Sequence, residues 1–205
     1  MEAEKYIQSH DAFLFELDNV LYPLKDFHLQ VYYLFSQFME YSEQMDATAM
    51  LTAIQAHYAA DGHDGVFEKT ASQFGIPEKY KLNYDLLQRN IRLPLKLLLF
   101  DHVLRFMKAV VAAGKPLFLL VSGNPEAQLN KIKQVEWQGL EQSLIVYFVE
   151  ELDNGLGDKG LTYLVDRHQL DNQQLLLIGH QEFKVLEKPD LKLTFLSADQ
   201  LFSVI

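Results

Sequence analysis

Residues 13–23 read Phe-Leu-Phe-Glu-Leu-Asp-Asn-Val-Leu-Tyr-Pro, and this segment governs the interpretation of the whole chain. Its apolar start predicts a buried strand, and two acidic residues, Glu16 and Asp18, stand on alternate positions where that strand ends. Side chains on alternate positions of a strand point to the same side. We therefore expect both carboxylates to face one site, where a phosphoryl group or a cation could lie.

The sequence after this segment changes to a helical pattern. From residue 23 to residue 99 the apolar residues recur at helical spacing, as at Phe27, Val31 and Phe35. Between turn residues, this spacing predicts helices over 25–41, 46–60, 65–74 and 78–90, and a shorter helix from Pro94. We expect residues 23–99 to form an all-helical insertion.

Apolar runs typical of strands return in the C-terminal half of the chain. They lie at 117–121, 144–149, 175–178 and 193–196, and helix-like segments separate them. Strands that alternate with helices indicate a mostly parallel sheet that is covered on both faces. With the strand around Phe13, we expect an α/β core of about five parallel strands, built from residues 1–22 and 100–205.

Composition limits the class of protein. The chain has 205 residues, of which 49% are hydrophobic and 22% charged, which is globular composition and enough length for a core with an inserted domain. The absence of cysteine excludes disulfides, thiolate zinc sites and cysteine nucleophiles. A net charge of −10 without a basic cluster argues against binding of nucleic acid.

Nothing in the sequence predicts a membrane segment. There is no run of about 18 uncharged apolar residues, and the first residues lack the basic-then-apolar order of a secretion signal. We expect no contact with a membrane and a cytoplasmic location.

The residues that follow the predicted strands are the candidates for a site, because ligands of open parallel sheets bind beyond the C-terminal strand ends. These candidates are Glu16, Asp18, Ser122, Gly123, Asn124, Lys159 within the segment 153–160, and His180.

The first segment resembles the first motif of the haloacid dehalogenase (HAD) superfamily, apolar-Asp-x-Asp-x-Thr/Val, and is most similar to the branch with pyrimidine nucleotidases. The resemblance implies a HAD-like, Rossmann-like core with a helical cap and magnesium-dependent hydrolysis of small phosphate esters. It implies that Glu16 takes the place of the nucleophilic aspartate and Asp18 that of the acid/base and metal ligand. It likewise matches Ser122 to the phosphoryl-binding hydroxyl and Lys159 to the third-motif lysine.

The fourth motif of that superfamily, Gly-Asp-x-x-x-Asp, is altered here. After Gly179 the two acidic positions hold His180 and Lys184. Magnesium prefers oxygen ligands, so an imidazole is a poor ligand and an ammonium is none. We expect the metal site to be lost and no cofactor to bind, with Mg²⁺ through Asp18 only if the family site survives. Lys184 could instead pair with Glu16 or Asp18.

These changes predict a protein that is impaired as a magnesium-dependent phosphatase and acts as a binding or interaction protein. Its partner would be a protein, or a small phosphorylated ligand such as a nucleotide or sugar phosphate. The ligand-binding residues would be Gly123, Asn124, His180 and Lys184, beside Ser122 and Lys159. Two alternatives stay open, namely metal-free acid/base chemistry by Asp18 or Glu16 with His180, and ordinary phosphatase activity through Glu16.

Overall fold

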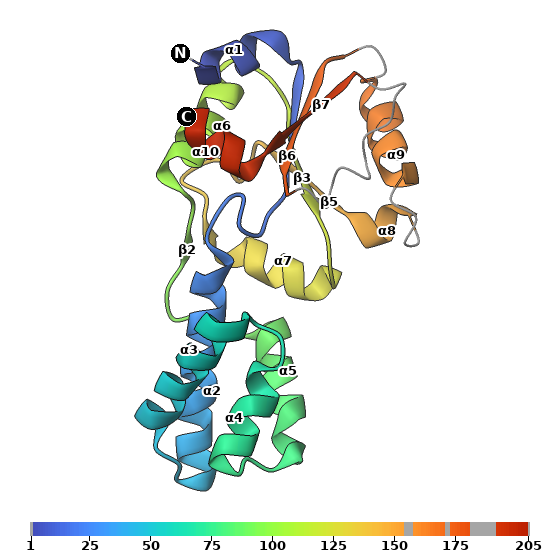
Figure 1. Cartoon of the computed structure of the whole chain (residues 1–205). Helices are drawn as coiled ribbons and strands as arrows, with labels where there is room; N and C mark the ends of the chain where they lie inside the picture. Colours follow the sequence, from blue (N-terminus) through green and yellow to red (C-terminus); the bar gives the residue numbers. More distant parts are fainter. Residues whose placement is uncertain (1, 154–157, 171–172, 181–191, 205) are drawn as a thin grey trace. The chain divides into compact units, whose positions relative to one another are not determined.

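The computed structural model of the chain describes residues 2–153, 158–170, 173–180 and 192–204 (Figure 1). The chain divides into two compact units. The core unit comprises Met1–Pro23, Leu98–Gln128 and Val135–Ile205, and the helical unit comprises Leu24–Leu97 with Leu129–Gln134. The domain bounds expected from the sequence, residues 1–22 and 100–205 for the core and 23–99 for the helical insertion, remain a prediction.

A five-stranded parallel sheet forms the centre of the core unit, in the order β5-β3-β1-β6-β7. Central strand β1 pairs on both sides, so that Phe13 lies opposite Leu117 and Leu176. The predicted fold class, a parallel α/β sheet of about five strands, is confirmed. The strands are β1 (Ala12–Phe15), β3 (Leu117–Val121), β5 (Leu144–Phe148), β6 (Leu175–Gly179) and β7 (Leu193–Ser197).

Helices cover both faces of this sheet, which explains why its central strands are continuously apolar. On one face Leu14 packs with Leu161 and Leu164 of α9, and on the other Phe13 contacts Phe106 of α6 at 5.7 Å between ring centroids. Figure 1 shows α9 on the first side and α1, α6 and α10 on the second. The helices of this part are α1 (Glu2–Ser9), α6 (Asp101–Ala112), α7 (Pro125–Gln134, which also enters the helical unit), α8 (Val149–Asp153), α9 (Asp158–His168) and α10 (Ala198–Val204).

The helical unit contains the helices that the apolar spacing predicted. Asp46 begins α3 by accepting a hydrogen bond from Ala49 N at 2.9 Å, and Gly75 ends α4 in the left-handed conformation. Among the described residues, none of the helices is both long and apolar enough to cross a membrane. The helices are α2 (Leu24–Glu43), α3 (Ala47–Asp61), α4 (Val66–Phe74), the 3-10 turn η1 (Glu78–Tyr80) and α5 (Lys81–Asn90).

The predicted helix from Pro94 is wrong. This segment bends at Pro94 and Leu95 and leads into the short strand β2 (Leu97–Leu98), and a second short strand, β4 (Val135–Glu136), was also missed. Side chains from two helices hold the main chain on either side of Pro94, because Leu95 N donates to Gln30 Oε1 at 2.8 Å and Leu93 N donates to Gln134 Oε1. Such contacts come from residues far away in the sequence, so local spacing does not reveal them.

A cluster of rings lies inside the helical unit around His63. Its imidazole stacks on that of His28 at 4.0 Å between ring centroids, and its Nδ1 lies 2.7 Å from the Tyr32 hydroxyl. Burial lowers the pKa of His63 by more than the nearby carboxylate of Asp64 raises it. The folded chain therefore favours the uncharged ring.

We expect His63 to make the chain less stable in acid. Between about pH 7.5 and about pH 5.5 the unfolded chain, with an ordinary histidine pKa near 6.5, binds more protons at this position than the folded chain. The free energy of unfolding should thus fall as the pH falls through this range. Urea unfolding of wild type and His63→Gln at both pH values measures the effect, since glutamine keeps a polar partner for Tyr32. An equally steep pH dependence in the variant would contradict the role of His63.

Candidate functional site

Three neighbouring strands end beside one another at the candidate site. Because β3, β1 and β6 are adjacent and parallel, their C-terminal ends lie along one edge of the sheet. Glu16 and Asp18 follow β1, Ser122 follows β3, and His180 follows β6. The structure therefore brings these sequence-predicted residues to the same edge of the core unit.

Glu16 is bound to the end of the neighbouring strand. Its Oε2 accepts a hydrogen bond from the main-chain nitrogen of His180 at 2.8 Å. The same oxygen lies against Gly179, where a Cβ atom would be only 2.8 Å away from it. A glycine at this position thus leaves room for the glutamate, and one oxygen of the lengthened carboxylate is committed to the protein main chain.

Asp18 accepts hydrogen bonds from two neutral side chains. The Tyr22 hydroxyl donates to Oδ1 at 2.5 Å, and Gln128 Nε2 donates to Oδ2 at 3.3 Å. Burial, reinforced by the charge of Asp18, raises the pKa of Tyr22, so the phenol stays protonated and remains a donor. The His180 ring is also close, with Nε2 at 3.2 Å from the main-chain oxygen of Asp18.

The turn after β3 is held by contacts within the core unit. Gly123 has φ of +99°, and its main-chain nitrogen donates to the carboxylate of Glu150 at the start of α8. Asn124 was expected to bind a ligand. Its Oδ1 accepts a hydrogen bond from Ala127 N at 3.0 Å, so Asn124 caps the N-terminus of α7. The Gly123 N–H, a donor in this turn that could bind a phosphoryl group, thus donates to the Glu150 carboxylate instead.

Gln128 is a site residue that the sequence analysis missed. It is 9% exposed, and its Nε2 donates both to Asp18 and, at 2.7 Å, to the main-chain oxygen of Ser122, joining the loops after β1 and β3. The sequence does contain a signal for Gln128. The Asn-Pro pair at 124–125 predicts the start of a helix, and Gln128, four residues after Asn124, then lies one helical turn further on the same helix face as Asn124. Glu150 was missed as well, although it directly follows an apolar run.

The two candidate lysines are outside what can be described at side-chain level. Lys159 lies in α9, but its side chain is not among those described, and Lys184 falls in the segment 181–191 outside the described residues. Their expected roles remain predictions.

The described residues of this edge do not fit a magnesium ion. Magnesium needs several oxygen ligands in octahedral geometry. Here Glu16, both Asp18 carboxylate oxygens and the Asp18 main-chain oxygen each have a nitrogen or hydroxyl group of the protein beside them. Within the part of the chain that is described, no three histidine or acidic side chains are grouped to hold a metal.

Comparison with known proteins shows which fold this is. No model of a known protein family and no curated protein sequence matches the chain. A Thermotoga maritima protein provisionally named a β-phosphoglucomutase has a TM-score of 0.57 at 11% identity, covering 95% of this chain and 97% of that one. The Bacillus subtilis protein YfnB, provisionally named a HAD-hydrolase and bound to magnesium, has a TM-score of 0.54 at 11% identity, covering 96% and 98%.

A HAD family hydrolase from Deinococcus radiodurans, with bound phosphate and sodium, has a TM-score of 0.52 at 15% identity, covering 92% of this chain and 80% of that one. At such identities the likeness is one of fold. The chain has the HAD-like fold of these hydrolases, as the resemblance of its motifs implied.

We expect the close approach of Glu16 to Gly179 to appear as coupling between the two residues. Gly179→Ala should cost about 1–3 kcal/mol, because the added methyl group pushes the carboxylate away from the His180 amide. In a Glu16→Asp background the shorter side chain leaves room for the added methyl group, so the cost of Gly179→Ala should fall by more than about 0.5 kcal/mol. Urea unfolding of the two single variants and the double variant measures this, and equal costs in both backgrounds would refute the contact.

Proposed function

We propose that this chain is a binding or interaction protein built on a HAD-like hydrolase fold and impaired as a magnesium-dependent phosphatase. The observation that carries the proposal is the hydrogen bond from the His180 main-chain nitrogen to Glu16. This hydrogen bond ties the Glu16 carboxylate to the main chain, and Glu16 is the residue that the resemblance places at the position of the nucleophile.

The position of Glu16 supports the loss of nucleophilic attack. An added methylene moves the carboxylate by roughly one bond length, and a misplacement of about 1 Å can cost on the order of a hundredfold in rate. The contact with His180 adds to this, since an attacking oxygen would have to leave a hydrogen bond to the main chain.

The surroundings of Asp18 support the loss of metal-assisted chemistry. A metal ion that polarises a phosphoryl oxygen supplies several kcal/mol of transition-state stabilisation, and each ~1.4 kcal/mol corresponds to a tenfold rate. Asp18 is bound instead to Tyr22 and Gln128, and the residue in place of the next acidic ligand is His180. Among the described residues, these two donors bind both carboxylate oxygens of Asp18.

The contact between Glu150 and Gly123 favours a protein partner over a small phosphorylated ligand. A phosphate ester would compete with the Glu150 carboxylate for the Gly123 amide and would be repelled by its charge. A phosphorylated ligand would depend on Ser122, Lys159 and Lys184, the roles proposed for these residues from the sequence.

The second candidate function is hydrolysis of small phosphate esters by a metal-independent route. One observation favours it, namely the presence of the His180 ring beside Asp18 and its amide beside Glu16. In this route Asp18 or Glu16 would exchange a proton with the substrate together with His180.

We expect negligible magnesium-dependent phosphate release. Across nucleotides and sugar phosphates, turnover should stay well below about 1 s⁻¹, the lower end of typical enzyme rates, and Glu16→Ala should change nothing. A phosphate-release assay with magnesium and with a chelator measures this. Magnesium-stimulated turnover near 1 s⁻¹ that disappears in Glu16→Ala would refute the proposal. Activity that survives the chelator and is lost in His180→Ala would favour the second function.

Restoring the family's acidic residues should restore activity. We expect the triple variant Glu16→Asp, His180→Asp, Lys184→Asp to gain magnesium-dependent phosphate release of at least about tenfold over wild type, because it rebuilds a nucleophile of normal length and two oxygen ligands. The double variant that keeps Glu16 is the matched control for the nucleophile. A well-folded triple variant without any gain would show that these three positions are not the cause of the impairment.

A further inference from the structure

Strand β5 is an edge strand without the usual protection. It pairs with β3 along Leu144–Phe148, and among the described residues no strand pairs with its other side. Edge strands in soluble proteins are commonly guarded by lysine, proline or a bulge, since their unpaired main-chain groups accept further strands. The five residues Leu-Ile-Val-Tyr-Phe include no charge and no proline, and Ile145 is 36% exposed.

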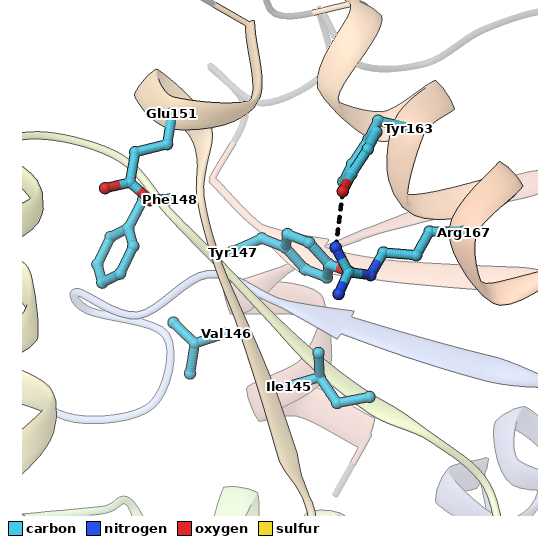
Figure 2. A pocket seen from close by; sticks show the side chains of 7 residues that line it. All are labelled: Ile145, Val146, Tyr147, Phe148, Glu151, Tyr163 and Arg167. Carbon is cyan, nitrogen blue, oxygen red and sulfur yellow. Dashed lines mark hydrogen bonds between the residues drawn. The ribbon is translucent and has the colours of Figure 1, made fainter.

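A groove of about 580 Å³ follows this open edge (Figure 2). Its lining includes four consecutive residues of β5, from Ile145 to Phe148. Consecutive side chains of a strand point to opposite sides, as Tyr147 and Phe148 do in Figure 2. A hollow that touches four residues in a row must therefore adjoin the main chain at the strand edge. The other lining residues are Glu151 of α8 and Tyr163 and Arg167 of α9.

One wall of the groove presents an oriented cation. Arg167 Nη1 donates to the Tyr163 hydroxyl at 2.6 Å, and its guanidinium carbon lies 5.8 Å from the centroid of the Tyr163 ring. In Figure 2 the guanidinium lies beside the Tyr147 ring in this view and is joined to the Tyr163 hydroxyl by the dashed line. A guanidinium has five N–H donors in a planar fork that matches a carboxylate. This wall is suited to an acidic side chain.

We propose that the open edge of β5 binds an extended segment of a partner protein as an added strand, with an acidic side chain of that segment on Arg167. Main-chain hydrogen bonds to β5 supply the affinity, and alternate side chains of the added strand enter the groove. The proposal rests on the proposed binding function and names its surface and the chemistry of its partner.

The occupant is a different protein rather than a second copy of this chain. Two copies joined at this edge would place Leu144–Phe148 of one beside the same segment of the other. That segment has no carboxylate for Arg167, and the carboxylates that follow it, Glu150 and Glu151, belong to α8 and not to the paired strand. An acidic partner strand carries its carboxylate within the paired segment.

Three labelled peptides test the proposal on the full-length chain by fluorescence anisotropy. The acidic probe is Ac-VEVEV-NH2, the basic probe is Ac-VKVKV-NH2, and the third is the acidic probe N-methylated at all of its residues, which removes their main-chain N–H donors. We expect the acidic probe to bind at least about tenfold more tightly than either of the others, because charge-assisted and main-chain hydrogen bonds are both required. Arg167→Glu should reverse the preference in favour of the basic probe. Arg105→Glu, the same charge change at an exposed arginine of α6, should leave it unchanged.

Each other outcome overturns the proposal. Equal binding of the acidic probe and its N-methylated form would exclude strand addition, and no binding of any probe would exclude the site. A stable dimer in light scattering that excludes the peptide would assign the edge to a second copy. Phosphate release is measured independently, so a failure at β5 leaves the interpretation of Glu16 and Asp18 intact, and phosphatase activity would not remove a peptide site.

Discussion

The burial of β1 and of the loop that follows it constrains the whole candidate site. All four residues of β1 are 0% exposed, and in the loop Leu17, Val20, Leu21 and Tyr22 are at most 1% exposed. A buried phenol needs a hydrogen-bond partner, because an unsatisfied polar group costs about 1–3 kcal/mol. Asp18 is that partner for Tyr22. The carboxylate is thus oriented by the same packing that anchors the loop.

The C-terminal edge of the sheet satisfies its acidic groups from within. Glu16 accepts from the His180 amide, Asp18 from Tyr22 and Gln128, and Glu150 from the Gly123 amide. Carboxylates at one strand end would repel each other unless donors or cations compensate their charge. In a hydrolase that relies on magnesium, such oxygens are kept available for the ion. Here main-chain and side-chain donors of the described residues bind these oxygens and hold the loops together, which supports the proposed loss of metal-assisted chemistry.

Two surfaces of the core unit meet at the short helix α8. Glu150 binds the turn after β3, while the next residue, Glu151, lines the groove beside β5. The first surface resembles the catalytic edge of hydrolases with this fold, but its donors and acceptors are largely paired with one another. The second has aromatic rings, an oriented guanidinium and a strand edge that no further strand pairs within the described residues. For this reason the proposed binding site is placed at the second surface.

Local pattern alone determined the parallel α/β core, the helices of the insertion and the strand ends that carry Glu16, Asp18, Ser122 and His180. Hydrophobic periodicity is a property of neighbouring residues, and the C-terminal ends of parallel strands must share an edge. The replacement of two acidic positions by His180 and Lys184 was equally visible in the sequence.

Only the tertiary structure decided which atoms satisfy one another. The contact of Glu16 with His180 spans 164 residues, and that of Gln128 with Asp18 spans 110, so no local spacing reveals them. The same holds for the segment around Pro94, where Leu95 N donates to Gln30 and Leu93 N donates to Gln134. Asn124 could be either a ligand contact or a helix cap from its sequence, and the geometry of α7 made it a cap. The sequence determines residue type and period, but hydrogen-bond partners depend on distances that exist only after the chain has folded.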